Sequence, residues 1–247
     1  MDSSTRTTPR PVRPVDGTAR RLLPLVDGEQ LAREEFHRRY EAMPESFRAE
    51  LIEGVVHVTS PVRIRHSGPH AQVVGLLFNY ACRTRGVEVL DNATDYLDDV
   101  NEFQPDAILY IESEAGGQTR TSEDDYLEGP PELVVEVAAS TVRIDTKVKR
   151  EVYQRLGVRE YIVWRVPDQA IDWWELREEA YVLLTADEAG VVCSRVFPGL
   201  CLDVPAILSG DSARALATLE AHLAKHADAH ADFVGRNAKA LGDETVH

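Results

Sequence analysis

A nearly continuous apolar segment, PELVVEVAAS at residues 131–140, constrains the fold of this chain more than any other segment. Unbroken runs of Val and Leu of this kind are typical of a strand at the centre of a sheet that is covered on both faces. Segments on either side alternate between short strand-like and helical patterns, which is typical of an α/β protein. We therefore expect a central sheet flanked by helices. Further strands are expected at residues 47–61 (two strands that turn near Glu53 and Gly54), 87–91, 94–98, 105–112, 159–166, 170–178 and 180–187.

Helical periodicity predicts the remaining elements. Apolar residues recur at helical spacing in 28–43, where Asp27 is a plausible N-cap. The same spacing occurs in 70–86 and in 144–157, and each of these two segments ends at a glycine. An Ala-rich segment from residue 211 onward indicates a helix or a pair of helices. The polar, acidic and Gly-rich stretch 113–129 is expected to be a surface loop.

The chain is expected to consist of three parts. Residues 1–28 are predicted to form a flexible, basic, Pro-rich arm, residues 29–210 the main domain, and residues 211–247 a C-terminal helical extension. The arm lacks the apolar core of a signal peptide, and no run approaches the roughly 18–20 apolar residues that a membrane span needs. We therefore expect a cytoplasmic protein with no membrane contact.

Three cysteines, Cys82, Cys193 and Cys201, are too few and too scattered to suggest a disulfide framework or a cysteine-based metal site. A reducing compartment is the simplest interpretation.

Two acidic residues stand out from the predicted strands. Glu136 lies among five apolar residues in LVVEVA, and a buried carboxylate costs several kcal/mol unless it is paired, hydrogen-bonded or metal-bound. Asp106 opens the strand at 105–112, and strand ends are where α/β sheets gather ligand-binding groups. Taken singly, Asp106 is more simply a turn or cap residue, and Glu136 could instead be buried against an arginine.

The helix that follows Glu136 supplies a third group. Asp145, Lys149 and Tyr153 are spaced i, i+4, i+8, so they share one helix face that can lie across the sheet. Taken alone, Asp145 and Lys149 could be a surface ion pair, and Tyr153 is better explained by packing. Trp164, Trp173 and Trp174 are likewise better explained by packing than by base stacking.

Together, two acids and a lysine suit phosphodiester hydrolysis. Asp106 and Glu136 would bind Mg²⁺ or Mn²⁺ through hard oxygen ligands. The metal would activate water, and Lys149 would orient the nucleophile or stabilise the transition state.

At this point the chain resembles a known family, the Uma-type restriction endonucleases of bacteria, within the PD-(D/E)XK nuclease superfamily. The resemblance runs from about Tyr40 to Leu208. It rests on AELIEGVVHVTSP, RHSGPH, DNATDYL, QPDAILYI, YLEGPPELVVEVAAS, DTKVKREVYQRLGVREYIVWR and SRVFPGLCLDV. The resemblance implies a restriction-endonuclease-like core with a central mixed sheet, and a divalent-metal nuclease site.

Carried over by residue, the resemblance assigns Asp106 to the QPD motif and Glu136 to the VVEVA motif. Many superfamily members have a lysine two residues after the second acid, where this chain has Ala138, so the lysine of this family is Lys149 on the next helix. Glu50 in the ELI motif matches a further acid of the site. His66 and His70 match a segment that could position water or substrate, and Asp145 is a further candidate for this role.

Two features depart from the simplest expectation. The segment EVAAST is one residue shorter than the EVLSPST that the family often has, which could rotate the helix that carries Lys149. The net charge is −15, whereas nucleic-acid enzymes usually have a basic surface. Positive charge is concentrated in the arm, at Arg63 and Arg65, and in 143–150.

Three functions follow as hypotheses. The first is a Mg²⁺- or Mn²⁺-dependent endonuclease that acts on DNA, as a monomer or a homodimer. The second is a non-catalytic protein that keeps the nuclease fold and binds a partner protein or a nucleic acid. The third is metal-dependent hydrolysis of another phosphate ester.

Overall fold

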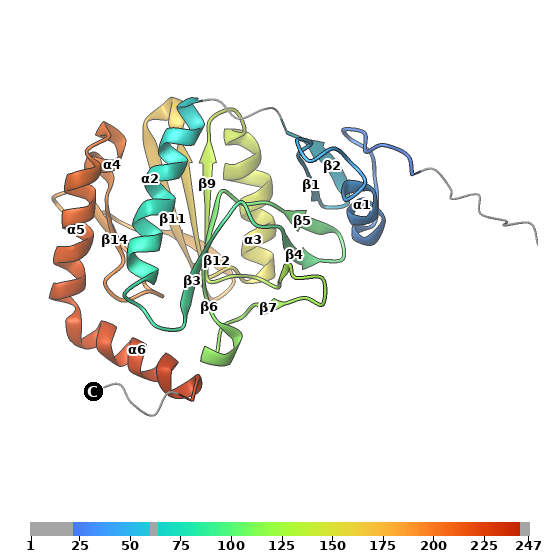
Figure 1. Ribbon diagram of the computed structural model, residues 1–247. Coiled ribbons are helices and arrows are strands. Elements are labelled where there is room, and N and C mark those ends of the chain that lie inside the picture. The colour runs from blue at the N-terminus through green and yellow to red at the C-terminus, as the bar shows by residue number, and fades with distance from the viewer. Residues whose placement is uncertain (1–21, 60–63, 243–247) are drawn as a thin grey trace, which may run out of the picture.

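The computed structural model describes residues 22–59 and 64–242 as two large sheets with helices on their faces (Figure 1). The first sheet is mixed, because β9 and β10 run parallel and its other neighbours antiparallel. Its order is β12 (Ala180–Leu183), β11 (Ala170–Arg177), β10 (Glu160–Arg165), β9 (Leu133–Ala138), β6 (Ala107–Ile111) and β3 (Val87–Asp91). The expected α/β fold with a central mixed sheet is confirmed.

The apolar segment forms β9, and all six of its residues are buried. Leu133, Val135 and Val137 face a core that includes α2 (Ile64–Ala81). Val134 and Ala138 face the opposite core, which includes the helix after β9. Because successive side chains of a strand point to opposite faces, the continuous apolar run reflects coverage on both sides.

The helix after β9 has two parts, η2 (Ile144–Lys149), which is wound as a π-helix, and α3 (Arg150–Leu156). It ends as expected at Gly157, which adopts a φ of 91°. This left-handed backbone conformation is easily reached only by glycine. The chain then enters β10, which lies parallel to β9, so the helix covers the strand that precedes it.

The second sheet lies beside the first and carries the N-terminal part of the described chain (Figure 1). The predicted turn at Glu53 and Gly54 is confirmed, with φ values of 52° and 75°. Phe36 of α1 (Arg33–Tyr40) is buried in the same core cluster as Leu51. The order of this sheet is β2 (Val55–Val58), β1 (Ala49–Ile52), β5 (Asn101–Phe103), β4 (Asp95–Asp98), β8 (Leu127–Glu128) and β7 (Arg120–Thr121).

The C-terminal region is helical, as expected, but it is not separate from the main core. Ala215, Leu219 and Phe233 are buried in the same cluster as the α2 side chains. The predicted extension consists of α5 (Ser212–Lys225) and α6 (Ala227–Ala240). It follows a two-stranded sheet, β13 (Val191–Cys193) and β14 (Cys201–Asp203), and the short helix α4 (Val204–Ser209). Short 3₁₀ turns occupy η1 (Ser113–Ala115) and η3 (Val166–Asp168). No helix within 22–59 and 64–242 has the length and apolarity to cross a membrane.

The N-terminal boundaries differ from the prediction. Of the expected arm, 1–28, residues 1–21 lie outside the described residues. Residues 22–28, however, belong to the packed domain, because Leu25 is buried and Arg39 donates hydrogen bonds to the carbonyls of Leu23 and Pro24. The first helix begins at Arg33 and not near Asp27, whose carboxylate accepts a hydrogen bond from the Val58 amide.

The cysteine prediction was also wrong in one respect. Cys193 and Cys201 lie opposite each other on β13 and β14 and form a disulfide. Only Cys82 is a free, exposed thiol. Spacing in the sequence could not show this pairing, because it depends on a hairpin whose strands are only three residues long. All three tryptophans are buried, which agrees with the expected packing role.

Glu160, at the start of β10, is fully buried and ties the β13–β14 loop to the main sheet. Its carboxylate accepts hydrogen bonds from the Arg195 and Val196 amides, the Ser194 hydroxyl and the Trp173 indole. Burial raises its pKa to about 7, although these donors oppose the shift. A carboxyl whose pKa is raised by folding stabilises the fold fully below its unfolded pKa, and that contribution is lost as the pH rises.

We therefore expect part of the free energy of unfolding to decrease between about pH 4.5 and pH 7 because of Glu160. Glu160→Gln should remove this part of the slope, although it should also destabilise the protein at low pH by about 1–3 kcal/mol through lost hydrogen bonds. Denaturant unfolding of both proteins across this range measures the difference. An unchanged slope in the variant would show that Glu160 does not titrate there.

Candidate active site

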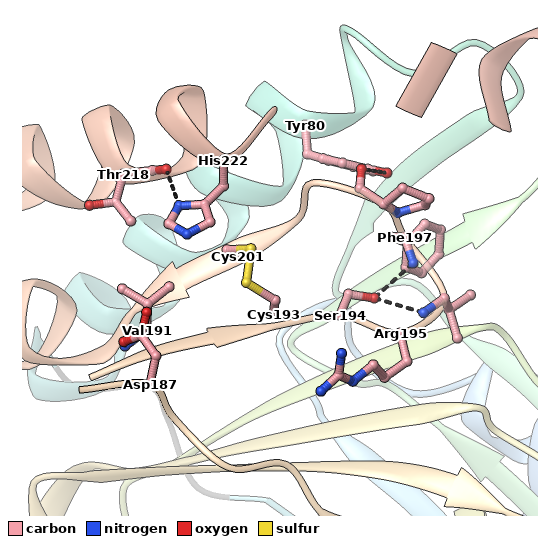
Figure 2. The surroundings of a disulfide bond; sticks show 12 residues. Tyr80, Asp187, Val191, Cys193, Ser194, Arg195, Phe197, Cys201, Thr218 and His222 are labelled. Atoms are coloured by element: carbon pink, nitrogen blue, oxygen red, sulfur yellow. Dashed lines mark hydrogen bonds between the residues drawn. A yellow bond between two sulfur atoms is a disulfide. The ribbon is translucent and has the colours of Figure 1, made fainter. Parts of the chain in front are cut away.

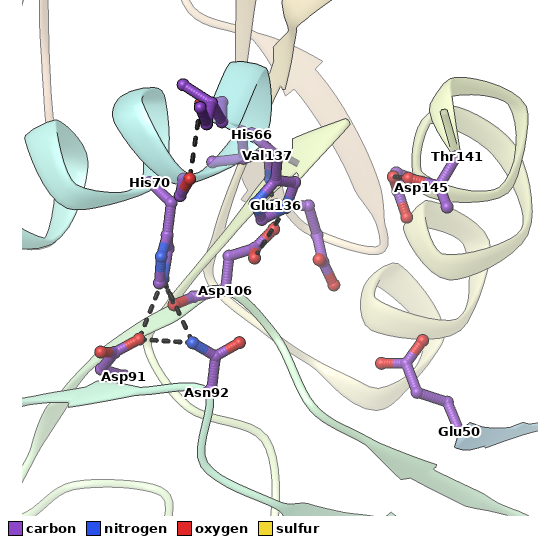
Figure 3. Close-up of polar contacts among 12 residues, drawn as sticks. Glu50, His66, His70, Asp91, Asn92, Asp106, Glu136, Val137, Thr141 and Asp145 are labelled. Carbon is purple, nitrogen blue, oxygen red and sulfur yellow. Dashed lines mark hydrogen bonds and ion pairs between the residues drawn. The ribbon is translucent and has the colours of Figure 1, made fainter. Parts of the chain in front are cut away.

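Glu136 and Asp106 come from neighbouring strands of the central sheet. β6 and β9 pair antiparallel with Ala107 opposite Val135, so continuing this register by one residue sets Asp106 opposite Glu136. Residues directly opposite each other in an antiparallel pair point to the same side. Figure 3 shows their two carboxyl groups next to each other, between α2 and the helix that begins near Thr141.

Lys149 reaches these acids from the helix after β9. Its Nζ lies 2.9 Å from Glu136 Oε1 and 2.8 Å from each carboxylate oxygen of Glu50. Asp145 Oδ1, one helical turn earlier, is 4.0 Å away. All four side chains are buried, and Lys149 is only 4% exposed. Asp145 and Lys149 both lie in η2, the part of the helix that is wound as a π-helix. The shorter connection after Glu136 does not turn Lys149 away from the sheet.

Glu50 comes from the second sheet. It lies on β1, and its side chain points toward the group from the opposite side to α2 (Figure 3). Besides Lys149, it accepts a hydrogen bond from the Gln104 amide at 2.8 Å. The residues that surround Lys149 are therefore contributed by three separate segments of the chain.

Tyr153 completes the helix face that its spacing predicted. Its hydroxyl lies 3.3 Å from Glu136 Oε1, and its ring packs edge-on against Phe103. The sequence analysis assigned this residue to packing, whereas the structure also gives it a polar contact with Glu136. The shared helix face was the available signal, and the position of the hydroxyl could not be inferred from spacing.

Asp106 is held by both backbone and side-chain contacts. Its Oδ2 accepts a hydrogen bond from the Val137 amide at 2.6 Å, and its Oδ1 lies 3.1 Å from His66 Nε2. His70, one turn further along α2, contacts the backbone carbonyl of Asp106 at 2.8 Å and the Asp91 carboxylate at 2.9 Å (Figure 3). The two predicted histidines are thus both at Asp106, but only His66 meets its carboxylate.

Burial and mutual repulsion shift the ionisation of these groups. Burial raises the pKa of Glu136 and raises that of Asp145 to about 6, while the Lys149 ammonium opposes both shifts. Burial alone would lower the pKa of Lys149, but Glu136, Glu50 and Asp145 raise it well above its ordinary value. A hydrogen bond to Asp106 raises the pKa of His66. The acidic neighbours of Lys149 therefore favour its protonated, charged form.

A buried acid close to Tyr153 was also missed by the sequence analysis. Asp95 on β4 is fully buried, neither of its oxygens has a hydrogen-bond partner in the described part of the chain, and burial raises its pKa. Burial raises the pKa of the Tyr153 hydroxyl, and the nearby Asp95 adds to this shift. The β4 sequence, DYLD, combines acidic and apolar residues, so no sequence pattern distinguished Asp95 from a surface acid.

The donor set fits a hard divalent cation such as Mg²⁺ or Mn²⁺. Asp106 and Glu136 offer carboxylate oxygens, and no hydrogen bond from the described residues reaches Glu136 Oε2. In the described ranges, no three acids of this site bring ligand atoms within 4.8 Å of one another. Two carboxylates with water and substrate phosphates in the remaining positions are the usual way in which proteins hold Mg²⁺.

Comparisons with known proteins agree with this architecture. A family model described as "Uma2: Putative restriction endonuclease" matches residues 33–205. A crystal structure of a protein described as a putative nuclease belonging to DUF820, from Anabaena variabilis ATCC 29413, is similar with a TM-score of 0.55 and 14% identity. The match covers 70% of this chain and 96% of that chain, and at this identity it shows a shared fold. No curated protein matches the sequence.

Proposed function

Because the chain belongs to the Uma2 family, whose model is described as a putative restriction endonuclease, we propose that it is a metal-dependent endonuclease that hydrolyses phosphodiester bonds in DNA. Asp106 and Glu136 hold Mg²⁺ or Mn²⁺, and Lys149 is the catalytic ammonium. The observation that carries the proposal is the convergence of these three side chains, from two strands and one helix, in a single buried group.

Bound Mg²⁺ or Mn²⁺ would make water a stronger nucleophile near neutral pH and offset the charge of the phosphate. The protein's own groups do the rest. Lys149, kept protonated by its acidic neighbours, can donate a hydrogen bond to the nucleophile or to a phosphate oxygen where negative charge develops. Glu50 accepts a hydrogen bond from Lys149 at Oε1 and forms an ion pair with it through Oε2, which together fix the direction of the ammonium.

Several other residues would keep these groups in position. Tyr153 lies against Glu136 Oε1, which leaves Oε2 as the oxygen available to an ion. The Val137 amide fixes Asp106 Oδ2, and His66 on Oδ1 can exchange a proton with incoming substrate or water. Asp145 accepts a hydrogen bond from the Thr141 hydroxyl and adds to the field around Lys149.

Exposed cations near the site support a nucleic-acid substrate in spite of the net charge of −15. Arg65 precedes His66 on α2, and Arg143 and Lys147 flank Asp145 on the helix that carries Lys149. All three are exposed, and within the described ranges none of them forms an ion pair. Cations at such positions can neutralise phosphates, which supplies much of the affinity for nucleic acids.

A non-catalytic binding role is the second candidate, because the acidic surface disfavours tight binding of duplex DNA. The deciding experiment is incubation of the purified chain with supercoiled and linear DNA, and separately with RNA, with Mg²⁺, Mn²⁺ or a chelator. We expect cleavage of DNA that requires a divalent ion and stops in the chelator. No cleavage of DNA or RNA by the folded chain under any of these conditions would favour the binding role.

A further inference from the structure

A second cluster of metal-ligating side chains lies far along the chain from the acidic site, where β13 and β14 meet α5. Cys193, Cys201 and His222 each bring a ligand atom within 4.8 Å of the other two. Within the described residues, no other three His, Cys, Asp or Glu side chains meet this distance. Figure 2 shows the His222 ring on the helix above the two sulfur atoms.

The hairpin that carries the cysteines is held in place without the disulfide. The loop between its strands is anchored by hydrogen bonds from Ser194, Arg195 and Val196 to the buried Glu160. Phe197 and Leu200 in the same loop are fully buried in the main core. Because these contacts do not involve sulfur, reduction of the disulfide should leave Cys193 and Cys201 facing each other across the hairpin.

His222 is equally fixed. Asp203, at the end of β14, accepts hydrogen bonds from the Arg214 guanidinium and the Thr218 hydroxyl of α5. Gly199 lies so close to Leu223 that an added Cβ would come within 2.9 Å of its side chain, and its φ of 85° also favours glycine. The hairpin and the helix are therefore tightly packed on both sides of His222.

The hydrogen bond of His222 is the one that a metal ligand needs. Its Nδ1 lies 3.0 Å from the Thr218 carbonyl, an acceptor, so Nδ1 donates this hydrogen bond, and in the neutral ring Nε2 is then the nitrogen with a free lone pair. Metal-bound histidines almost always donate their other ring nitrogen to a carbonyl or carboxylate in this way. A disulfide involves only the two sulfur atoms, so it does not explain why the His222 ring is oriented beside them.

We propose that, when its cysteines are reduced, this cluster binds a soft divalent cation of the Zn²⁺ class. Two thiolates and one imidazole are a known three-ligand set for Zn²⁺, with water in the fourth position. In the disulfide state, a dithiol or phosphine reductant supplies two electrons, and the sulfur–sulfur bond breaks as each sulfur takes up a proton. Metal binding then releases two protons as two metal–sulfur bonds and one metal–nitrogen bond form.

The test is Co²⁺ titration of the full chain, reduced with a phosphine and compared with the oxidised protein. Co²⁺ serves as a spectroscopic substitute for Zn²⁺, because a thiolate-to-cobalt charge-transfer band reports sulfur ligation directly. We expect a band that saturates at one equivalent in the reduced protein, is displaced by Zn²⁺ and is absent in the oxidised protein. The acidic site contains no sulfur, so an ion bound there does not contribute to the band.

Cys193→Ser and His222→Ala are the informative variants, since both positions are only half-buried. Each should weaken Co²⁺ binding at least about tenfold. His226→Ala, on an exposed position one turn further along, and Cys82→Ser, at the exposed free thiol, are matched controls that should keep the band. A band no stronger in the reduced wild type than in Cys193→Ser would overturn the proposal. An unchanged affinity in a folded His222→Ala protein would do the same, leaving a structural disulfide.

Discussion

Glu136→Gln should lower metal-dependent cleavage by at least about two orders of magnitude while the protein remains folded. Glutamine has nearly the same shape but lacks the negative charge that a divalent ion requires, and hard cations prefer carboxylate oxygens. Loss of one preorganised electrostatic group at a reaction centre typically costs a factor of about 10²–10³ in rate. Asp106→Asn should have a similar effect. Initial cleavage rates at saturating Mg²⁺ and Mn²⁺ measure both.

Glu132→Gln is the matched control for this experiment. Glu132 is also a fully buried glutamate, it lies just before the same strand, and its carboxylate accepts hydrogen bonds from the Ile111 and Gln118 amides, away from Lys149. Its variant should cleave normally at temperatures where it is folded. Equal activity of wild type and a folded Glu136→Gln protein would refute the assignment of the site, although not the family or the fold.

Lys149→Met should lower the free energy of unfolding by about 3–5 kcal/mol, the cost of removing one partner from a buried ion pair. Methionine can fill much of the space, but it leaves Glu50 and Glu136 without the cation that both contact within 2.9 Å. The loss is therefore electrostatic and not a loss of volume. Denaturant unfolding near pH 7 measures it, with Lys147→Met at an exposed position of the same helix as the control.

The pH dependence of the Lys149→Met variant tests the cause of this loss. Burial already raises the pKa of Glu136, and removing Lys149 removes the main opposing effect. Since a carboxyl with a raised pKa favours the folded state at low pH, the variant should regain stability relative to wild type as the pH falls toward about 4.5. A loss below about 1 kcal/mol, or one that does not depend on pH, would show that Lys149 does not compensate these acids.

Periodicity and composition determined the main elements of the fold. The unbroken apolar run indicated a strand covered on both faces, and β9 is buried throughout. Gly157 ended the following helix as predicted, and Glu53 and Gly54 formed the predicted turn. These features depend on neighbours in the chain, so they can be inferred from spacing and from the backbone preferences of single residues.

Local spacing also determined part of the candidate site. Glu136 was conspicuous because an acid in a buried strand needs a partner, and Lys149 lay on a helix that had to cover this strand. Glu50, His66 and His70 could be named only through the resemblance to a family. Their spacing along the chain carries no information about which carboxylate each of them meets.

Tertiary structure alone decided the remaining contacts. Packing of the second sheet against the helix after β9 brings Glu50 to Lys149 across 99 positions of sequence, and the register of β6 on β9 sets Asp106 beside Glu136. The same holds for the Tyr153 hydroxyl, the buried Asp95 and the pairing of Cys193 with Cys201. A sequence pattern indicates which residues are buried and at what spacing buried residues recur along the chain. The direction and partner of a buried polar side chain depend instead on how layers formed by distant segments pack together.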